Sequence, residues 1–541
     1  MRISGAQAIV EALDCQGVEI VFGIPGAYNL PLFDALYNHP RIRVITVRHE
    51  QAAAFMADGY ARASGNIAAA LLLPGPGVTN AYTGLGEAYA DSSPVLLLAS
   101  QVNREFINQN RGLLHELTGQ LEILAPVTKF SARLTNPRDS TALLHQAMYA
   151  IRNGRPRPAQ IEIPRDVQVE MFDADSPANC KAPARRERTL PPRSQIETVA
   201  RLLAAASRPL LFAGGGVVSS EASDVLVELA ERLGAPVLTT GMGAGSIPGD
   251  HPLACGVAWI ASGDIRPLVG AADALVMVGT RLNQAMTHDW QMPLPPVTVR
   301  IDIDPAEIER NLPAQHKLVG DARATLAAIL EFLKTRGIDR KRAVDATLAR
   351  AQQDFKRALE QRAGSTLPWM RALRETLPRR AIISADMTVF WADMLATFPL
   401  YEPRTMLFPW GYGTLGFGIP ETLGAKLACP ERPVVSIVGD GAFLFTGMEL
   451  ATAIQYRLNV PILLPNNNAY GMIKKQQGDM YDEQYIGVDL VNPDFVQLAH
   501  SFGAYGERVN TPDQLSAALA RALAADKPTV IEFEWGWKFA G

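Results

Sequence analysis

Short apolar runs alternate with longer segments of helical periodicity through most of the chain. In its first third, apolar runs at 18–22, 43–47, 68–73, 95–98 and 159–163 predict buried strands. Segments such as 50–63, where small and apolar residues recur at helical spacing, predict the helices between them. Ser4 and Gln7 have the spacing of a capping box, which predicts the start of a first helix. This alternation is typical of a parallel, doubly wound α/β sheet.

The same alternation occurs in two further blocks. Strands are predicted at 209–213, 237–239, 274–278 and 299–303, and then at 381–384, 434–438, 461–464 and 529–533. The polar, proline-rich stretch 174–195 indicates an interdomain linker, and the charge-rich helical pattern at 336–364 indicates a connecting surface helix. Capping-box spacing also predicts helix starts at Thr446–Glu449 and at Thr511–Gln514. We therefore predict an α/β protein of three consecutive doubly wound parallel-sheet domains, at 1–180, 190–335 and 366–541.

Composition narrows the class of protein. A chain of 541 residues is too long for one hydrophobic core, and 48% hydrophobic with 20% charged residues is ordinary for globular proteins. Lysine and arginine number 51 against 55 acidic residues, so no basic surplus favours nucleic acid or an anionic membrane as partner. The cysteines Cys15, Cys180, Cys255 and Cys429 lie far apart, so neither a disulfide framework nor a thiolate zinc site is expected. Because no signal core or membrane-spanning apolar run occurs, we expect a cytoplasmic protein.

The strongest candidate chemistry lies in the third block. The predicted strand 434–438 runs into Gly439-Asp440-Gly441, and Asn466-Asn467-Asn468 follows one crossover later. Neighbouring parallel strands end at one sheet edge, where such sheets bind ligands, so Asp440 and Asn467 are expected to lie close together. Glycines beside Asp440 let the backbone approach a phosphate, and carboxylate and carbonyl oxygens suit Mg²⁺ carrying a diphosphate. The alternative is that both motifs are only strand-end turns.

This motif resembles the diphosphate-binding motif of thiamine-diphosphate-dependent enzymes. The resemblance implies thiamine diphosphate and Mg²⁺ as cofactors, with Asp440, Asn467 and the Ala469 carbonyl as metal ligands. In the first block, Glu50 matches the family's catalytic glutamate, which hydrogen-bonds the cofactor's aminopyrimidine ring and so promotes loss of the thiazolium proton. Taken alone, Glu50 could instead be an acid that compensates a helix dipole.

The resemblance covers essentially the whole chain and implies further contacts with the cofactor. In the third block the Gly413 carbonyl would accept from the ring amine, and Leu415 would hold the cofactor bent, unless Leu415 is an ordinary core leucine. The other implied contacts are Gly26, Pro76, Asn80, Gly439, Gly441, Ala442, Tyr470, Gly471 and Met472. The domain order is that of acetolactate synthases, pyruvate decarboxylases and benzoylformate decarboxylases. In that group the cofactor lies between two subunits, so the resemblance implies a homodimer or homotetramer with active sites at the subunit interface.

The family's members share decarboxylation of a small-molecule 2-oxo acid and differ in the step that follows. Protonation releases an aldehyde, whereas transfer to a second carbonyl gives a hydroxy-ketone. The stretches 75–80 and 89–92 resemble the acetolactate synthase branch, but 111–117 departs from it. This Arg-Gly-Leu-Leu-His-Glu-Leu stretch resembles guanidino-oxopentanoate decarboxylases, and the resemblance makes His115 a catalytic proton donor. The alternative is that His115 is a polar interface residue.

The central block differs from the acetolactate synthases, which hold FAD there. Their Arg-Phe-Asp-Asp-Arg segment corresponds to 281–285, where Arg281 is kept but the acidic pair is absent. Gly214-Gly215-Gly216 alone is a weak phosphate signal. FAD is therefore not expected, although the sequence does not exclude it. A nicotinamide or flavin oxidoreductase would need a G-x-G-x-x-G turn, which this block lacks, although Glu231 lies at a suitable distance.

The substrate is expected to lie against loops of the first and third blocks. The candidate residues there are Ala27, Tyr28, Gln101, Ile473 and Gln477. None of them identifies the 2-oxo acid. The leading hypothesis is a thiamine-diphosphate- and Mg²⁺-dependent 2-oxo acid decarboxylase, with or without carboligase side activity. The alternatives are an acetolactate-synthase-like carboligase and a non-catalytic cofactor-binding homologue, and the presence of Glu50, Asp440 and Asn467 together argues against the second.

Overall fold

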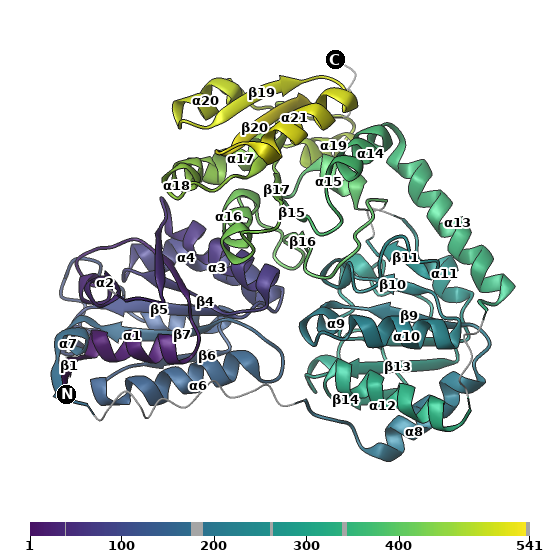
Figure 1. The fold of residues 1–541 in the computed structure, drawn as a ribbon, viewed down its shortest axis with the longest axis horizontal. Coiled ribbons are helices and arrows are strands. Elements are labelled where there is room, and N and C mark those ends of the chain that lie inside the picture. Colours follow the sequence, from purple (N-terminus) through teal and green to yellow (C-terminus); the bar gives the residue numbers. More distant parts are fainter. Residues whose placement is uncertain (38, 175–187, 260–262, 338–342, 396, 537–541) are drawn as a thin grey trace.

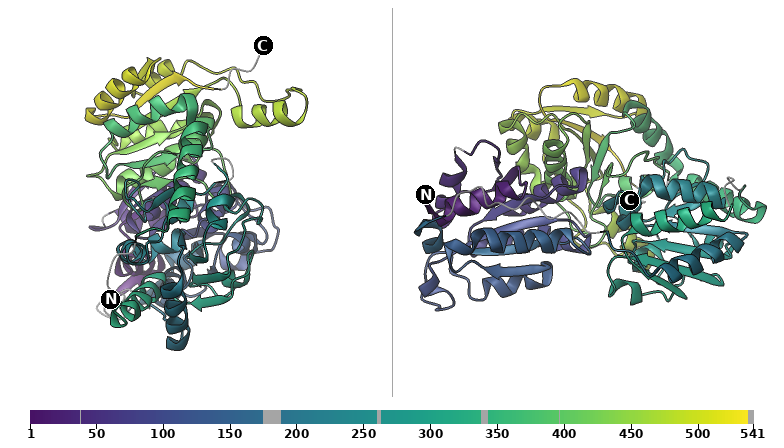
Figure 2. Two further views of the ribbon diagram at one scale, coloured as in Figure 1. Left: turned by 90° about the vertical axis from the view of Figure 1, so that its right-hand side faces the viewer. Right: turned by 60° about the horizontal axis from the view of Figure 1, so that its bottom comes forward.

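Three six-stranded parallel sheets organise the chain, one in each predicted domain (Figure 1). The structure is a computed structural model that describes residues 1–37, 39–174, 188–259, 263–337, 343–395 and 397–536. Helices cover both faces of each sheet, and the third domain lies above the other two (Figures 1 and 2). The predicted fold class, three consecutive doubly wound α/β domains, is confirmed.

The first sheet has the strand order β3-β2-β4-β5-β7-β6. Its strands are β2 (Ile20–Gly23), β3 (Arg43–Thr46), β4 (Ala68–Leu72), β5 (Val95–Gln101), β6 (Phe130–Arg133) and β7 (Ala159–Pro164). The helices are α1 (Gly5–Cys15), α2 (Leu30–Tyr37), α3 (Glu50–Ser64), α4 (Pro76–Ala90), α5 (Gln120–Leu124), α6 (Ser140–Arg152) and α7 (Arg165–Val169). Two short strands, β1 (Arg2–Ser4) and β8 (Met171–Asp173), pair with each other in antiparallel fashion. The predicted capping box of Ser4 and Gln7 is present at the start of α1.

The central sheet has the strand order β11-β10-β9-β12-β13-β14. Its strands are β9 (Pro209–Ala213), β10 (Val237–Thr239), β11 (Ala254–Val257), β12 (Ala274–Val278), β13 (Val297–Asp302) and β14 (His316–Val319). The helices are α8 (Arg193–Ala205), α9 (Gly215–Ser219), α10 (Ser223–Leu233), α11 (Arg266–Gly270) and α12 (Ala322–Thr335). The charge-rich stretch forms the connecting helix α13 (Ala346–Ala363), as predicted.

The third sheet has the strand order β16-β15-β17-β18-β20-β19. Its strands are β15 (Ile382–Ala385), β16 (Met406–Leu407), β17 (Val434–Ile437), β18 (Pro461–Asn466), β19 (Tyr505–Val509) and β20 (Thr529–Glu534). The helices are α14 (Leu367–Thr376), α15 (Val389–Met394), α16 (Gly418–Ala428), α17 (Asp440–Thr446), α18 (Leu450–Gln455), α19 (Gly471–Met480), α20 (Phe495–Ser501) and α21 (Pro512–Ala524). Thr511 caps α21 and accepts from the Gln514 N–H, as predicted.

The first and third sheets share one topology. When the strands of each sheet are counted in chain order, both read 2-1-3-4-6-5, whereas the central sheet reads 3-2-1-4-5-6. In both arrangements the order reverses beside the first strand of the sheet. Open parallel sheets bind ligands at that point, beyond the carboxyl ends of their strands.

Three sequence expectations need correction. Thr446 does not form a capping box with Glu449, because its hydroxyl donates to the Gly416 carbonyl and the Glu449 carboxylate is bonded elsewhere. The helix α8 begins at Arg193, inside the predicted linker, of which residues 175–187 lie outside the described part. Cys15 takes part in a disulfide, although no disulfide framework was expected. Among the helices that the structure describes, none has the length and apolar character needed to cross a membrane.

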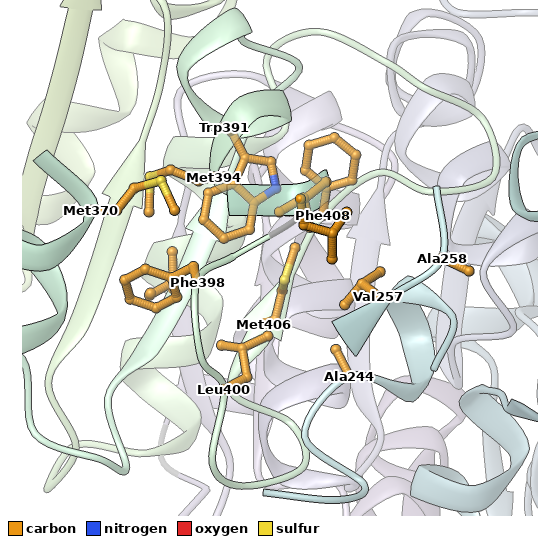
Figure 3. Packing of buried hydrophobic residues seen from close by; sticks show 14 of the residues in the cluster. Ala244, Val257, Ala258, Met370, Trp391, Met394, Phe398, Leu400, Met406 and Phe408 are labelled. Carbon is orange, nitrogen blue, oxygen red and sulfur yellow. The ribbon is translucent and has the colours of Figure 1, made fainter. Parts of the chain in front are cut away.

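Apolar cores join the third domain to both of the others. Ala244 and Val257 of the central domain pack with Trp391, Met406 and Phe408 of the third (Figure 3). A second core continues from α3 and α4 of the first domain into α16 and α17 of the third. The third domain is therefore fixed against both neighbours by buried side chains.

Candidate active site

Asp440 and Asn467 meet at one backbone amide. Asp440 follows β17 and begins α17, and Asn467 follows β18. The Ala469 N–H lies 3.2 Å from Asp440 Oδ2 and 3.2 Å from Asn467 Oδ1, and both oxygens accept from it. Asp440 is almost fully buried, and burial raises the pKa of its carboxyl. The two residues are therefore neighbours at one sheet edge, as their spacing predicts.

Asn492 completes this loop and was not predicted. Its Nδ2 donates to Asp440 Oδ2 over 2.7 Å and lies 3.2 Å from Asn468 Oδ1. The segment 488–490 pairs with 468–470, since the Tyr470 N–H donates to the Val488 carbonyl and the Leu490 N–H to the Asn468 carbonyl. In sequence, Asn492 precedes Pro493-Asp494, which indicates only the start of α20.

The loop suits a divalent cation that carries a diphosphate. A Cβ on Gly471 would lie 2.3 Å from Asn467 Nδ2, and one on Gly441 would lie 2.8 Å from the Tyr470 ring, so both positions need glycine. The helices α17 and α19 begin at this loop and leave unpaired N–H groups for anionic oxygens. Among the described residues no group of three or more His, Cys, Asp or Glu side chains could hold a metal ion. A cation here would be held by the oxygens of one carboxylate, one amide and one carbonyl, together with the diphosphate, which fits Mg²⁺.

Glu50 lies in the first domain, where it is the first residue of α3. Its Oε2 accepts from Asn80 Nδ2 over 3.0 Å. Asn80 is in the second turn of α4, whose first residue is Pro76. A Cβ on Gly77 would lie 3.8 Å from Glu50 Oε1, so the start of α4 lies against the carboxylate. The side chain of His49 caps α3 by accepting from the Gln51 N–H.

His115 lies over the start of α4. Its backbone carbonyl is so close to Gly75 that a Cβ there would approach it to 2.7 Å. The His115 and Tyr28 rings meet edge to face with their centroids 5.9 Å apart. His115 has φ +62°, a left-handed conformation that costs a non-glycine residue about 1–3 kcal/mol and is enriched at active sites. Gly26 also borders this region, because a Cβ on it would meet the Leu73 side chain.

Two of the predicted substrate-binding residues, Gln101 and Gln477, use their side-chain amides in hydrogen bonds to other residues of the chain. Gln101 is 1% exposed, and it donates to Glu162 Oε2 over 3.2 Å while its own Oε1 accepts from the Val102 N–H. Glu162 also accepts from Gln120, whose Oε1 accepts from the Gly75 N–H. Gln101 therefore belongs to a buried network that supports the start of α4. Gln477 donates to and accepts from the backbone of Ile486.

The other candidates lie at exposed turns and on a projecting helix. Ala27 is exposed, and its carbonyl accepts from Arg165. Gly413 has φ +72° and is exposed, and Leu415 is half-buried against the core shared by the first and third domains. Ile473 is half-exposed on α19, which also contains Met472 and which Tyr470 directly precedes. This helix projects from the body of the protein in the left view of Figure 2.

Within one chain, the residues of the candidate site form two groups that lie apart, one in the third domain and one around Glu50 in the first. Asp440, Asn467 and their partners all lie in the third domain. The N–H groups of Gly411 and Tyr412, just before Gly413, lie 3.4 Å from Glu87 Oε1 on α4. Glu87 is seven residues beyond Asn80, or about 10 Å along the helix axis. Gly413 is thus placed near one end of α4 and Glu50 near the other.

A cavity of about 490 Å³ lies where the three domains meet. Gly215, Gly216 and Gly279 line it at the strand-order reversal of the central sheet, with Arg281 and Asp302 beside them. Burial raises the pKa of Asp302 to about 6. This is the position at which a sheet of this order binds nucleotides.

Comparison with known proteins finds similarity in all three domains. Residues 3–123 match the thiamine pyrophosphate enzyme N-terminal TPP binding domain, 196–329 the central domain and 387–533 the C-terminal TPP binding domain. The chain is 38% identical to a probable 2-ketoarginine decarboxylase of Pseudomonas aeruginosa, over 98% of this chain and 94% of that protein. It is 36% identical to a probable acetolactate synthase large subunit of Methanocaldococcus jannaschii, over 98% and 91%. The acetolactate synthase large subunit of Corynebacterium glutamicum is 34% identical, over 98% and 87%.

The three domains, in this order and with these relatives, define an enzyme that depends on thiamine diphosphate. The chain belongs to the thiamine pyrophosphate enzyme family.

Proposed function

We propose that this protein is a thiamine-diphosphate- and Mg²⁺-dependent decarboxylase that converts a 2-oxo acid into an aldehyde, with or without carboligase side activity. The observation that carries the proposal is the position of His115 over the start of α4, the helix whose Asn80 binds Glu50. A histidine there can supply the proton that aldehyde release requires. The similarity to a probable 2-ketoarginine decarboxylase supports this choice.

Each group of residues has a defined task in this proposal. When bound, thiamine diphosphate supplies a nucleophilic carbon and accepts the electron pair that carbon dioxide leaves behind. Asp440, Asn467 and the Ala469 carbonyl would hold Mg²⁺, and Glu50 would hydrogen-bond the cofactor's ring, oriented by Asn80. His115 would protonate the product carbon while Tyr28 packs against its ring.

The competing proposal is an acetolactate-synthase-like carboligase. It is supported by the similarity to acetolactate synthase large subunits over nearly the whole chain. The two reactions share their first half and differ in whether the product carbon receives a proton or a second 2-oxo acid. A proton donor at His115 favours the first outcome.

Product analysis with a panel of 2-oxo acids, including pyruvate and 2-oxo-5-guanidinopentanoate, tests this choice. With both cofactors present we expect carbon dioxide and the matching aldehyde. Replacement His115→Gln should lower the rate of aldehyde formation by about 10²-fold, the usual contribution of a general acid, and raise the share of hydroxy-ketone. His145→Gln in α6 of the same domain is the matched control. Acetolactate from pyruvate without aldehyde would replace the proposal with the carboligase.

We further propose that two copies of the chain build each site. The cofactor's ring is far smaller than the distance along α4 that separates the Glu50 and Gly413 contacts, so one chain cannot supply both. Exposed apolar side chains surround the third-domain half of the site, which is where a second copy would cover it. They are Leu444, Phe445 and Met448 beside the metal loop and Met480, Tyr481, Ile486 and Val491 on and after α19.

Mixing two inactive variants tests this arrangement. Asp440→Ala should lose the metal and Glu50→Gln should lose cofactor activation, so each alone should be inactive. In an equimolar mixture about half of the dimers are mixed and have one intact site of two, so about a quarter of wild-type activity should return. Glu11→Gln, an exposed acid on α1, is the control for the glutamate change. A mixture that stays inactive after refolding together would show that the site is built within one chain.

Flavin is not part of the proposal. The cavity at the central sheet has the position of a nucleotide site, but it presents Arg281 without the acidic pair that acetolactate synthases place nearby. The proposed reaction transfers no hydride or electron to a second cofactor, so it has no step that requires flavin.

A further inference from the structure

Glu449 is a fully buried carboxylate that has partners in two domains. It ends the 3-10 helix Gly447–Glu449 that continues α17 in the third domain. Its Oε1 accepts from two backbone N–H groups of the first domain, those of Arg48 over 2.9 Å and His49 over 3.1 Å. Its Oε2 accepts from the Thr452 hydroxyl over 2.6 Å.

These two amides belong to the residues directly before Glu50. The strand β3 ends at Thr46 and α3 begins at Glu50, so the turn between them sets where the carboxylate of Glu50 points. The third domain makes two further contacts with this turn. The Thr46 N–H donates to the Tyr456 hydroxyl over 2.7 Å, and the Arg48 guanidinium donates to Gln455 Oε1 over 2.8 Å.

We propose that Glu449 is the positioning residue for Glu50, acting through the backbone amides of Arg48 and His49. This inference rests on the proposed role of Glu50. A carboxylate oxygen that accepts two adjacent N–H groups fixes the orientation of both peptide planes. Without it, two partly buried N–H donors would lose their partner and the turn could rotate.

The position of Glu449 also links two active sites. Asp440 is the first residue of α17, and Glu449 is the last residue of the 3-10 helix that follows α17. In a dimer with shared sites, Asp440 of one chain holds metal in one site, whereas Glu50 of the same chain, held by Glu449, serves the other. The segment 440–449 therefore runs from the metal-binding residue of one proposed site to the residue that holds Glu50 for the other.

Three variants separate positioning from general stability. Glu449→Ala should lower kcat by about 10²-fold with KM little changed, the effect expected when a catalytic group is misplaced by about 1 Å. Glu449→Gln should stay within a few-fold of wild type, because its amide oxygen can still accept from both N–H groups while its NH₂ donates to the Thr452 hydroxyl. Thr452→Val is the matched control, since it removes the Oε2 contact and leaves both backbone bonds.

Hydrogen exchange gives a measurement that does not depend on the cofactor. In the full-length protein without thiamine diphosphate, the amides of Arg48 and His49 should exchange faster in Glu449→Ala and at the wild-type rate in Glu449→Gln. Equal protection in all three variants would overturn the proposal, even if activity falls. A Glu449→Gln protein as slow as Glu449→Ala, with both folded, would overturn it as well.

Mixing inactive subunits tests whether Glu449 acts on the site that Glu50 of the same chain serves or on the site that Asp440 of the same chain serves. Glu449→Ala should regain activity, to about a quarter of wild type, when mixed with Asp440→Ala, because the Asp440→Ala chain supplies a well-held Glu50. It should regain none when mixed with Glu50→Gln. The reverse pattern, or recovery with neither partner, would overturn the proposal. Failure of Asp440→Ala with Glu50→Gln would instead contradict the shared site of the proposed function, and exchange and kcat would then decide the role of Glu449.

Discussion

Around Arg62, at the junction of the first and third domains, one guanidinium lies among several buried carboxyl groups. Its nitrogens lie 2.7 Å from Asp58, 3.1 Å from Asp91 and 3.5 Å from Glu421. Glu87 is buried beside them, and burial, followed by the charge of Asp91, raises the pKa of its carboxyl to about 9. Glu87 therefore keeps its proton at neutral pH, while an unfolded chain would release it near the ordinary value of 4.5.

Replacing Glu87 should change how stability depends on pH. The folded state binds the proton more tightly than the unfolded state, so this residue costs stability increasingly as pH rises from about 5 to about 9. The side chain of Glu87→Gln is neutral like the protonated acid. The free energy of unfolding of this variant, relative to that of wild type, should therefore rise by up to about 1.4 kcal/mol per pH unit in that window. Chemical denaturation at several pH values, with Glu11→Gln as control, measures the difference. A gap that does not vary with pH would contradict the raised pKa.

The residues of the proposed site differed in how far the sequence alone could predict them. Asp440 and Asn467 were predictable because two strand-end motifs one crossover apart must meet at a sheet edge, and the structure joins them at the Ala469 amide. Glu449 and Asn492 were not, because each acts on a loop that only the tertiary fold brings near. Glu449 even has the spacing of a helix cap, a local role that the contact with Arg48 replaces.

At the level of elements, the sequence pattern predicted the central strands of the three parallel sheets but, among their edge strands, only β3. The unpredicted strands β6, β11, β14, β16 and β19 all lie at the edge of their sheet. An edge strand pairs on one side only and keeps polar residues, as in β19 with its alternating exposure, so it lacks the continuous apolar run of a buried parallel strand. The central strands β4, β5, β9 and β12 are wholly buried and have that run.

The crossing of α3 and α16 depends on glycine at two points. A Cβ on Gly424 would lie 2.0 Å from the Met56 carbonyl oxygen, and one on Gly59 would lie 2.2 Å from that of Glu421. The helices are therefore in backbone contact, and α3 carries Glu50 at its first position.

Gly424→Ala should separate the two helices. We expect a free energy of unfolding lower by about 2 kcal/mol, because the overpacking exceeds the gain in helix propensity. Gly270→Ala at the end of α11, whose added Cβ would meet only the Pro293 ring at 3.7 Å, should leave stability unchanged or slightly higher. Denaturant titration of the two variants compares them. Equal stability would show that α16 can shift without cost.

At the scale of the whole molecule, the first and third domains share one strand order and have different tasks. In the third sheet, strand ends hold the proposed metal ligands, while in the first a strand end leads to Glu50. The order of the domains was readable from sequence because each block repeats the α/β alternation. Their mutual placement was not, since it depends on buried contacts such as Arg62 with Glu421 and Glu449 with Arg48.

The edge strands have a consequence for how the protein behaves at high concentration. Each sheet has two edges whose unpaired backbone groups could recruit another chain. In this protein β16 has only two residues, β11 pairs with an irregular register, and β3, β6, β14 and β19 each carry a charged or titratable side chain. Short length, irregularity and charge are the features that keep sheets from joining edge to edge. In β6, β14 and β19, the polar residues that make the strand hard to predict from the sequence thus also act against aggregation of the folded chain.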